Sequence, residues 1–167
     1  MTQPLVVLVG PMGAGKTTVA GLLATAYDVT ARDTDHDVES TSGRTVSDIF
    51  VESGETHFRD LERAAVAEAL ATHDGVLALG GGAILDPATR ELLAGHRVVF
   101  LRVGLSDAVK RVGLGVGRPL LLGNVRARIK ALLDERTPLY ESVAAHVVDT
   151  DQTTPEDVAS RVQEALR

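Results

Sequence analysis

Four short runs of apolar residues, rich in valine and leucine, set the strongest limit on how this 167-residue chain can fold. The runs lie at residues 5–9, 76–79, 98–103 and 147–148, and each stands next to glycine, aspartate or threonine. Continuous apolar runs of this length are typical of strands that are buried on both faces, as in a parallel sheet. The sequence therefore predicts a parallel β-sheet at the centre of the fold.

The segments between these runs have the apolar spacing of helices. Residues 17–26, 55–71 and 124–136 show this spacing, and a last helix is expected after Thr154, an N-cap residue that is followed by Pro155. Strands that alternate with helices form right-handed β-α-β units. We therefore expect one α/β domain over residues 1–167, a three-layer sandwich whose ligands bind beyond the carboxyl ends of the strands.

The composition excludes several classes of protein. The chain carries 17 Lys and Arg against 23 Asp and Glu, a net charge of −6, and only 3% of its residues are aromatic, so no nucleic-acid partner is expected. Cysteine is absent, which excludes disulfides and thiolate chemistry. The sequence has no signal-peptide pattern and no apolar run long enough to span a membrane. We expect a monomer in the cytoplasm.

The sequence GPMGAGKT at residues 10–17 directly follows the first apolar run and precedes the first helix. It matches GxxxxGK[ST], in the strand-then-helix context that distinguishes a phosphate-binding loop from an incidental match. Its glycines let backbone N–H groups surround a phosphate, Lys16 reaches the β- and γ-phosphate oxygens, and the Thr17 hydroxyl binds Mg²⁺. The motif predicts a nucleotide site.

Two features narrow the class of nucleotide-binding protein. The Asn-Lys-x-Asp motif with which GTPases read guanine is absent, because the only asparagine, Asn124, is not followed by lysine. The apolar runs at residues 76–79 and 98–101 are followed by Gly80 and Arg102, where motor and AAA-type ATPases place acids. Phosphoryl transfer to a small acceptor is therefore the expected reaction type.

Asp33 and Asp35 are the first acidic residues after this loop, placed where a second strand should end. Two carboxylates two residues apart on an extended segment point to opposite sides, so they can serve different partners. One would hold Mg²⁺ through water and the other would take the acceptor hydroxyl as base or orienter. An Asx-turn or a helix N-cap is the alternative explanation of such a pair.

Three glycines and two arginines complete the candidate site. Gly80, Gly81 and Gly82 follow an apolar run, where backbone N–H groups can approach a substrate closely, although a plain tight turn explains them almost as well. Arg59 and Arg136 lie on predicted helices, and a pair of arginines can clamp a carboxylate. The five histidines show neither metal-ligand spacing nor a triad partner.

A glycine-rich stretch marks the loosest part of the chain. Residues 113–117 contain three glycines and lie between Arg111 and Arg118. We expect a mobile lid over about residues 112–124 that closes on the phosphates and excludes water.

Taken together, these residues resemble the shikimate kinases, a family with the nucleoside monophosphate kinase type of structure. The resemblance runs from residue 5 to about residue 155. It depends on the order and spacing of the phosphate loop, Asp33 and Asp35, Phe50, Phe58 with Arg59, the three glycines, Arg111, Arg118 to Leu121, and Arg136 with Pro138 to Tyr140. It implies a five-stranded parallel sheet in the order 2-3-1-4-5. It also implies that ATP phosphorylates the 3-hydroxyl of shikimate, on the route to chorismate and the aromatic amino acids.

The motif and the resemblance together place ATP and Mg²⁺ along the chain. The expected ATP-binding residues are Gly13, Ala14, Gly15, Lys16, Thr17, Thr18, Arg111 and Arg118. In the family Arg111 would stack on the adenine and Arg118, on the lid, would close over the phosphates. Mg²⁺ would be bound directly by Thr17 and through water by Asp33.

The resemblance also implies where shikimate binds and which residues are catalytic. A helical part at about residues 34–62 would contribute most of the shikimate site. The expected shikimate-binding residues are Asp35, Phe50, Phe58, Arg59, Gly81, Gly82 and Arg136. The two arginines would hold the carboxylate and the two phenylalanines would pack against the ring. Lys16, Asp35 and Arg118 would be the catalytic residues, with Asp35 as the candidate base.

One loop departs from the family pattern, and two other functions remain open. Family members often carry an arginine near the adenine in the loop after the last strand, where this chain has Thr153. A kinase for another small hydroxy acid, such as gluconate, would need a similar set of residues. A nucleotide-binding module without catalysis would not need Asp35, Arg59 and Arg136 in addition to a phosphate loop.

Overall fold

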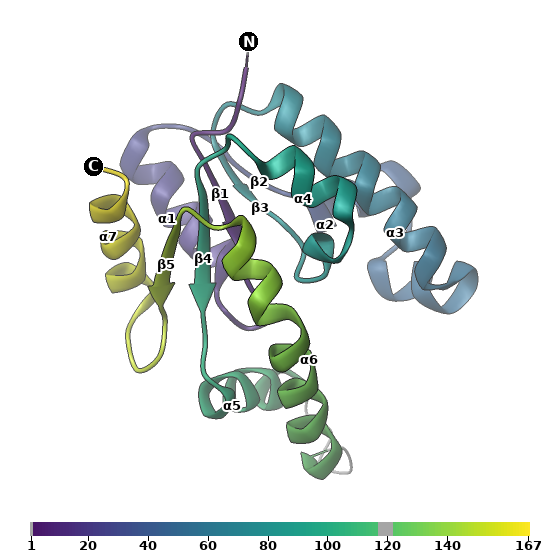
Figure 1. Cartoon of the computed structure of the whole chain (residues 1–167). Helices are drawn as coiled ribbons and strands as arrows, with labels where there is room; N and C mark the ends of the chain where they lie inside the picture. The colour runs from purple at the N-terminus through teal and green to yellow at the C-terminus, as the bar shows by residue number, and fades with distance from the viewer. Residues whose placement is uncertain (1, 117–121) are drawn as a thin grey trace.

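Five parallel strands form the central sheet of the protein (Figure 1). The computed structural model describes residues 2–116 and 122–167. Its strands are β1 (Val6–Val9), β2 (Ala31–Asp33), β3 (Val76–Ala78), β4 (Val98–Arg102) and β5 (His146–Asp149). The strand order β2-β3-β1-β4-β5 confirms the predicted order, and β1 is central because Val7 pairs with Leu77 on one side and with Val98 on the other.

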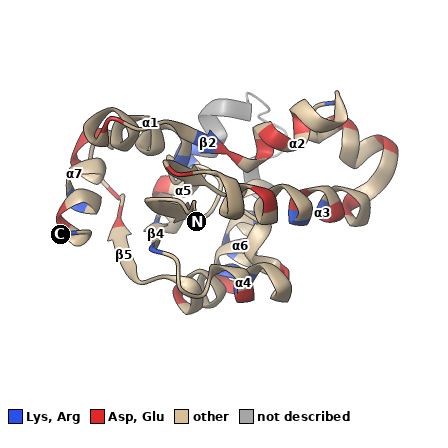
Figure 2. Cartoon of the chain, turned by 90° about the horizontal axis from the view of Figure 1, so that it is seen from above, with Lys and Arg blue, Asp and Glu red and all other residues tan. Residues whose placement is uncertain are grey.

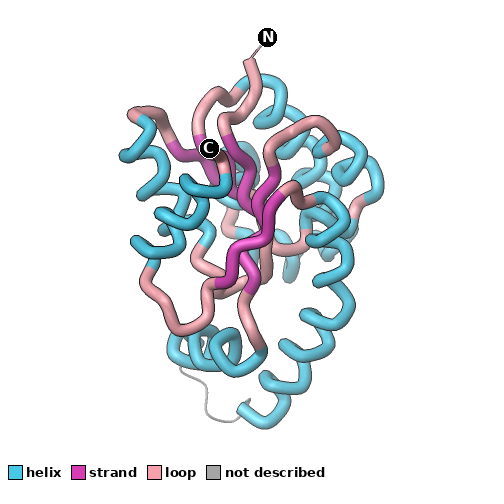
Figure 3. Tube along the Cα trace, turned by 60° about the vertical axis from the view of Figure 1, so that its left-hand side comes forward, coloured by secondary structure: helices cyan, strands magenta, loops and turns pink. Residues whose placement is uncertain are grey.

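Helices cover both faces of this sheet (Figures 1 and 3). They are α1 (Lys16–Tyr27), α2 (Thr34–Ser42), α3 (Val46–Thr72), α4 (Pro87–Leu93), α5 (Leu105–Val116), α6 (Leu122–Val143) and α7 (Pro155–Ala165), with a 3-10 turn η1 at Ala83–Leu85. Side chains of α1 and α7 pack on one face, and side chains of α3, α4 and α6 pack on the other. The α/β sandwich expected from the sequence is confirmed.

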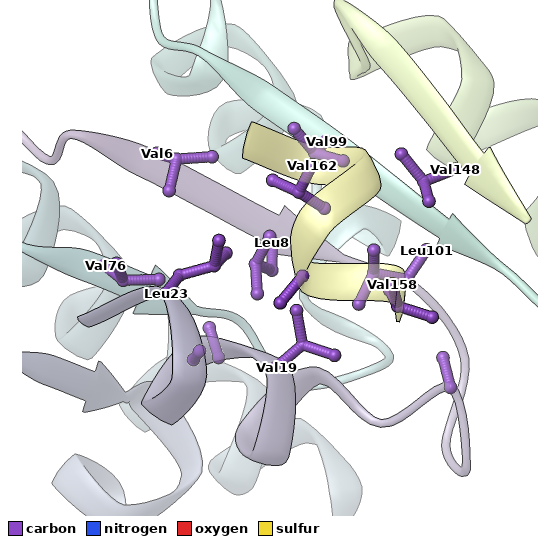
Figure 4. Close-up of a cluster of buried hydrophobic side chains, with 14 of the residues drawn as sticks. Val6, Leu8, Val19, Leu23, Val76, Val99, Leu101, Val148, Val158 and Val162 are labelled. Carbon is purple, nitrogen blue, oxygen red and sulfur yellow. The ribbon is translucent and has the colours of Figure 1, made fainter. Parts of the chain in front are cut away.

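Alternation along each strand divides the core into two layers, one on each side of the sheet. Val6 and Leu8 of β1 point to the α1 and α7 side, where they join Leu23 and Val162 (Figure 4). Val7 and Val9 point to the opposite side and join the cluster under α3, α4 and α6. Because both faces of β1 are buried, its residues read as a continuous apolar run in the sequence.

Two helices are longer than their apolar spacing indicated. Helix α3 begins at Val46, and Gly54, with φ at 86°, divides it just before the predicted start at residue 55. Helix α6 continues past Pro138, a residue that removes one helix hydrogen bond. Tyr140 explains this continuation, because its fully buried ring stacks on Phe100 with the ring centroids 4.9 Å apart. Tertiary packing therefore holds a helix that the local sequence would end.

The structure describes only the two ends of the predicted lid. Helix α5 runs through Gly113 and Gly115 to Val116, so these glycines do not end the helix, although glycine costs about 1 kcal/mol relative to alanine in a helix. Residues 122–124, at the end of the predicted lid, begin α6, and residues 117–121, which include Arg118, lie outside the described residues. The motion of the lid stays a prediction.

Among the helices that the structure describes, none has both the length and the apolar character needed to cross a membrane. Acidic residues recur along α2 and α3 in the view of Figure 2.

Replacement of Leu23 by alanine tests the packing of α1 on the sheet. Leu23 is fully buried among Val6, Leu8 and Val162, so Leu23→Ala should lower the free energy of unfolding by about 2–5 kcal/mol. Leu92 of α4 is 44% exposed, and Leu92→Ala should cost less than about 1 kcal/mol. Urea denaturation measures both. Equal losses in the two variants would contradict the assignment of Leu23 to the core.

Candidate active site

The phosphate loop joins the carboxyl end of β1 to the first residue of α1. Gly15 is the N-cap residue of α1 in the left-handed conformation, with φ at 89°, and no side chain caps this end of the helix. The Lys16 ammonium lies over the loop and donates hydrogen bonds to the carbonyl oxygens of Gly10, at 2.6 Å, and Pro11, at 3.0 Å. The loop therefore combines free backbone N–H groups with a cation, as phosphate binding requires.

Lys16 also faces two carboxylates. Loss of solvation lowers the pKa of its ammonium to about 8, while the negative charges of Asp35 and Asp33 act in the opposite direction. The ammonium therefore remains mainly cationic at neutral pH, at a position between the phosphate loop and the end of β2.

Asp33 ends β2 and caps α2. We expected Asp33 and Asp35 on opposite sides of an extended segment, and this is wrong, because the chain turns into a helix at Thr34. The Asp33 carboxylate accepts the Asp35 N–H at 2.8 Å through Oδ1, the helix N-cap bond that was the alternative explanation. Its other oxygen, Oδ2, accepts the Thr17 hydroxyl at 2.9 Å.

Thr17 and Asp33 present hydroxyl and carboxylate oxygens side by side, which are the hard ligands that Mg²⁺ prefers. Among the described residues no group of three or more His, Cys, Asp or Glu could hold a metal ion. The pair therefore suits a cation whose other ligands come from phosphate and water, as is usual for Mg²⁺ with a nucleotide.

Asp35 lies in the first turn of α2 and is half-buried. Burial and then repulsion by Asp33 raise the pKa of its carboxyl, and Lys16 opposes this rise. A raised pKa is the direction that a proton acceptor needs. The carboxylate presses against the turn at residues 80–82, where a Cβ on Gly80 would lie 2.5 Å from Asp35 Oδ1. A side chain at residue 80 would therefore displace the Asp35 carboxylate.

Two guanidinium groups meet at the same turn. The Arg59 guanidinium lies against Gly82, where a Cβ would lie 2.5 Å from its Nη1 atom. Arg136 Nη1 would lie 3.9 Å from a Cβ on Gly81. The Nε atoms of both arginines are buried and have no hydrogen-bond partner among the described residues. The two cations thus come together from α3 and α6, in the wall of one cavity.

Three neighbours of this turn were not predicted from the sequence. Glu62 is 4% exposed and accepts a hydrogen bond from Arg59 Nη1 at 2.7 Å; burial raises the pKa of its carboxyl, and Arg59 opposes this. Thr34 is fully buried and its hydroxyl oxygen accepts the Gly80 N–H at 3.1 Å. The hydroxyl of Tyr140 donates to the carbonyl oxygen of Gly81 at 2.6 Å. Only Glu62 left a signal, as an acid three positions after Arg59 on a helix with an apolar stripe.

A cavity of about 780 Å³ contains most of the predicted site. The predicted residues that line it are Gly13, Gly15, Lys16, Thr17, Thr18, Asp33, Asp35, Phe50, Phe58, Arg59, Gly81, Gly82 and Arg136. Phe50 and Phe58 pack together, with their ring centroids 4.8 Å apart, and the Arg59 guanidinium lies 5.3 Å from the centroid of the Phe58 ring. An apolar wall therefore stands beside the paired cations.

The other predicted residues lie elsewhere. A smaller cavity, of about 210 Å³, lies beside the phosphate loop and is lined by Ala14 and Arg111, with Thr153 and Pro155 from the loop after β5. Arg111 Nη1 donates to the Gly13 carbonyl oxygen at 2.9 Å, and Nη2 donates to that of Thr150 at 2.8 Å. Arg118 lies outside the described residues.

Comparisons with known proteins identify the family. A sequence model of the family described as shikimate kinase matches residues 12–167. A shikimate kinase of Thermobifida fusca (strain YX) is 59% identical over 99% of this chain and 96% of its own length, and one of Salinispora arenicola (strain CNS-205) is 58% identical over 98% of each. A solved shikimate kinase from Acinetobacter baumannii, in complex with shikimate, is 36% identical with a TM-score of 0.90, covering 99% of this chain and 93% of that one. The chain belongs to the shikimate kinase family.

Proposed function

We propose that the protein transfers the γ-phosphoryl group of ATP to the 3-hydroxyl of shikimate and releases shikimate 3-phosphate and ADP. Its family makes it an ATP-dependent kinase that acts on an alcohol group. The observation that carries the choice of acceptor is the meeting of Arg59 and Arg136 over the turn at residues 80–82, in the cavity that also holds Lys16 and Asp35. Two guanidinium groups beside an apolar wall suit a small ring that bears a carboxylate.

On the ATP side, the phosphate loop receives the triphosphate. Backbone N–H groups at the start of α1 and the Lys16 ammonium face the β- and γ-phosphates. Thr17 and Asp33 would hold Mg²⁺, which supplies positive charge to the phosphate oxygens. The smaller cavity, which adjoins the loop at Ala14, would receive the adenosine half, with Arg111 as part of its wall.

On the acceptor side, each group has one task. Arg59 and Arg136 bind the carboxylate from the wall of the cavity, and Glu62 holds Arg59 in place. Phe50 and Phe58 contact the ring. The backbone at Gly81 and Gly82 lines the same cavity, where it can approach the substrate beside Arg59 and Arg136.

Asp35 then orients the 3-hydroxyl and accepts its proton as the oxygen attacks the γ-phosphorus. Its position favours this task, because the carboxylate lies between Lys16, on the phosphate side, and the turn that carries the arginines. An ordinary carboxylate is a weak base for an alcohol, so positioning and charge contribute most of the rate. The proposal includes a cytoplasmic monomer and a lid that carries Arg118, as the sequence predicts.

The first prediction concerns the acceptor. In a coupled assay with Mg-ATP, we expect ADP release to depend on added shikimate. Gluconate at the same concentration should give no more ADP than the reaction without acceptor, because its flexible chain does not match a rigid apolar wall. Stimulation by gluconate without stimulation by shikimate would assign the protein to a different acceptor. If neither compound stimulates ADP release, the result would favour a nucleotide-binding module without catalysis.

Asp35→Asn tests the role of the carboxylate. The amide cannot accept the proton, so we expect turnover to fall by about 10²-fold or more, with Mg-ATP binding almost unchanged. Asp37→Asn is the matched control, because Asp37 lies in the same turn of α2 but pairs with Arg32 at 2.7 Å. Steady-state rates and calorimetric binding of nucleotide measure the two effects. Loss of nucleotide binding in Asp35→Asn would move Asp35 from the acceptor to the ATP side.

Arg136→Ala tests the carboxylate clamp. A hydrogen bond to a charged group contributes about 1.5–3 kcal/mol, so the KM for shikimate should rise by about 10-fold to 100-fold while the KM for ATP changes little. Arg126→Ala, at an exposed position of the same helix, is the control and should change neither KM. A larger rise for ATP than for shikimate would contradict the clamp.

A further inference from the structure

The smaller cavity beside the phosphate loop has walls from two elements that are far apart in the sequence. Arg111 comes from α5, and Thr150 and Thr153 come from the segment that joins β5 to α7. The cavity also adjoins the phosphate loop, because Gly13 and Gly15 line it. The inference below rests on the proposed function, because it treats this cavity as the adenosine half of the ATP site.

Arg111 holds three elements together. Its guanidinium donates to the Gly13 carbonyl oxygen in the phosphate loop at 2.9 Å, and to the hydroxyl and carbonyl oxygens of Thr150 at 3.1 and 2.8 Å. The Thr150 hydroxyl in turn donates to the Arg102 carbonyl oxygen at 3.0 Å. The position of Arg111 therefore determines the distance between the phosphate loop and the segment after β5.

Asp107, one turn before Arg111 on α5, contacts both walls. Its Oδ2 accepts the Gln152 N–H at 3.0 Å and lies 3.7 Å from Arg111 Nη2. Gln152 has a φ of 52°, in the left-handed region that a residue with a side chain rarely adopts. Asp107 thus accepts a hydrogen bond from the backbone N–H of a residue that is held in a strained conformation.

A second carboxylate fixes the same segment without touching Arg111. Asp151 accepts the Gly104 N–H at 2.8 Å, just before α5, and a Cβ on Gly104 would lie 2.8 Å from Asp151 Oδ2. Asp107 of α5 thus accepts an N–H of the segment after β5, and Asp151 of that segment accepts an N–H from the residue before α5. Of the two, only Asp107 also contacts the guanidinium that reaches the phosphate loop.

We propose that Asp107 is a positioning residue for ATP: its carboxylate fixes Gln152 and Arg111 so that the walls of the smaller cavity fit the adenosine half of the nucleotide. The hydrogen bond to the Gln152 N–H carries most of the effect. The ion pair to Arg111 is long and partly exposed, and such pairs contribute little.

The test compares Asp107→Ala, which removes the acceptor, with Asp107→Asn, whose amide oxygen can still accept the Gln152 N–H. We expect Asp107→Ala to raise the KM for ATP and the Kd for ADP with Mg²⁺ by about tenfold, with kcat and the KM for shikimate within about twofold of the unchanged protein. Asp107→Asn should recover most of the nucleotide affinity. Asp134→Ala is the control, because Asp134 forms an exposed pair with Lys130, also four residues apart on one helix.

Two results would overturn the proposal. One is an Asp107→Ala protein in which both KM values rise together or the affinity for ADP is unchanged, and the other is an Asp107→Asn protein as impaired as Asp107→Ala. If Asp107→Ala does not fold, Asp107→Glu, which moves the acceptor by one methylene, should raise the Kd for ADP, and an unchanged Kd would count against Asp107. Calorimetry with ADP and Mg²⁺ needs no shikimate, so absence of shikimate phosphorylation would overturn the proposed function while the role of Asp107 is still measured.

Discussion

The turn at residues 80–82 is the constraint on which the rest of the site depends. The Gly80 N–H is bound by the buried Thr34 hydroxyl, and the Gly81 carbonyl oxygen is bound by Tyr140. A Cβ at Gly80 would meet the Asp35 carboxylate, and a Cβ at Gly82 would meet the Arg59 guanidinium. One three-residue turn therefore fixes the position of groups from α2, α3 and α6 relative to β3. A side chain at this turn would displace a carboxylate or a guanidinium group, and both kinds of group are needed at the same place.

The charge of the large cavity is balanced rather than basic. Among the described residues that line it, the four basic ones are Lys16, Arg59, Arg128 and Arg136, and the four acidic ones are Asp33, Asp35, Glu55 and Glu62. Specificity for an anion therefore depends on where the donors lie. The buried Nε atoms of Arg59 and Arg136 are unsatisfied among the described residues, which is costly in the folded protein.

The sequence was sufficient for the sheet order, through a resemblance, and for the phosphate loop, whose spacing is specific. It failed where tertiary contacts override local preference. Helix α6 passes Pro138 because Tyr140 is packed below it, and Asp35 lies on a helix because Asp33 caps it. Thr34 was missed because a buried hydroxyl that accepts a hydrogen bond from residue 80 has no local signature. Such contacts join residues that are far apart in the sequence, 46 positions for Thr34 and Gly80, and no local periodicity indicates them.

Pro138 has a mechanical consequence for α6. The helix is fixed by the buried Tyr140 on one side of the proline, and Arg136 lies two residues away on the other side. Missing one hydrogen bond, the helix bends most easily there. At 1.5 Å per residue, a tilt of about 5° at Pro138 moves Arg136 by only ~0.3 Å but moves the backbone at Leu122 by ~2 Å. A small adjustment of Arg136 by bending at Pro138 would therefore be accompanied by a larger displacement at the start of α6.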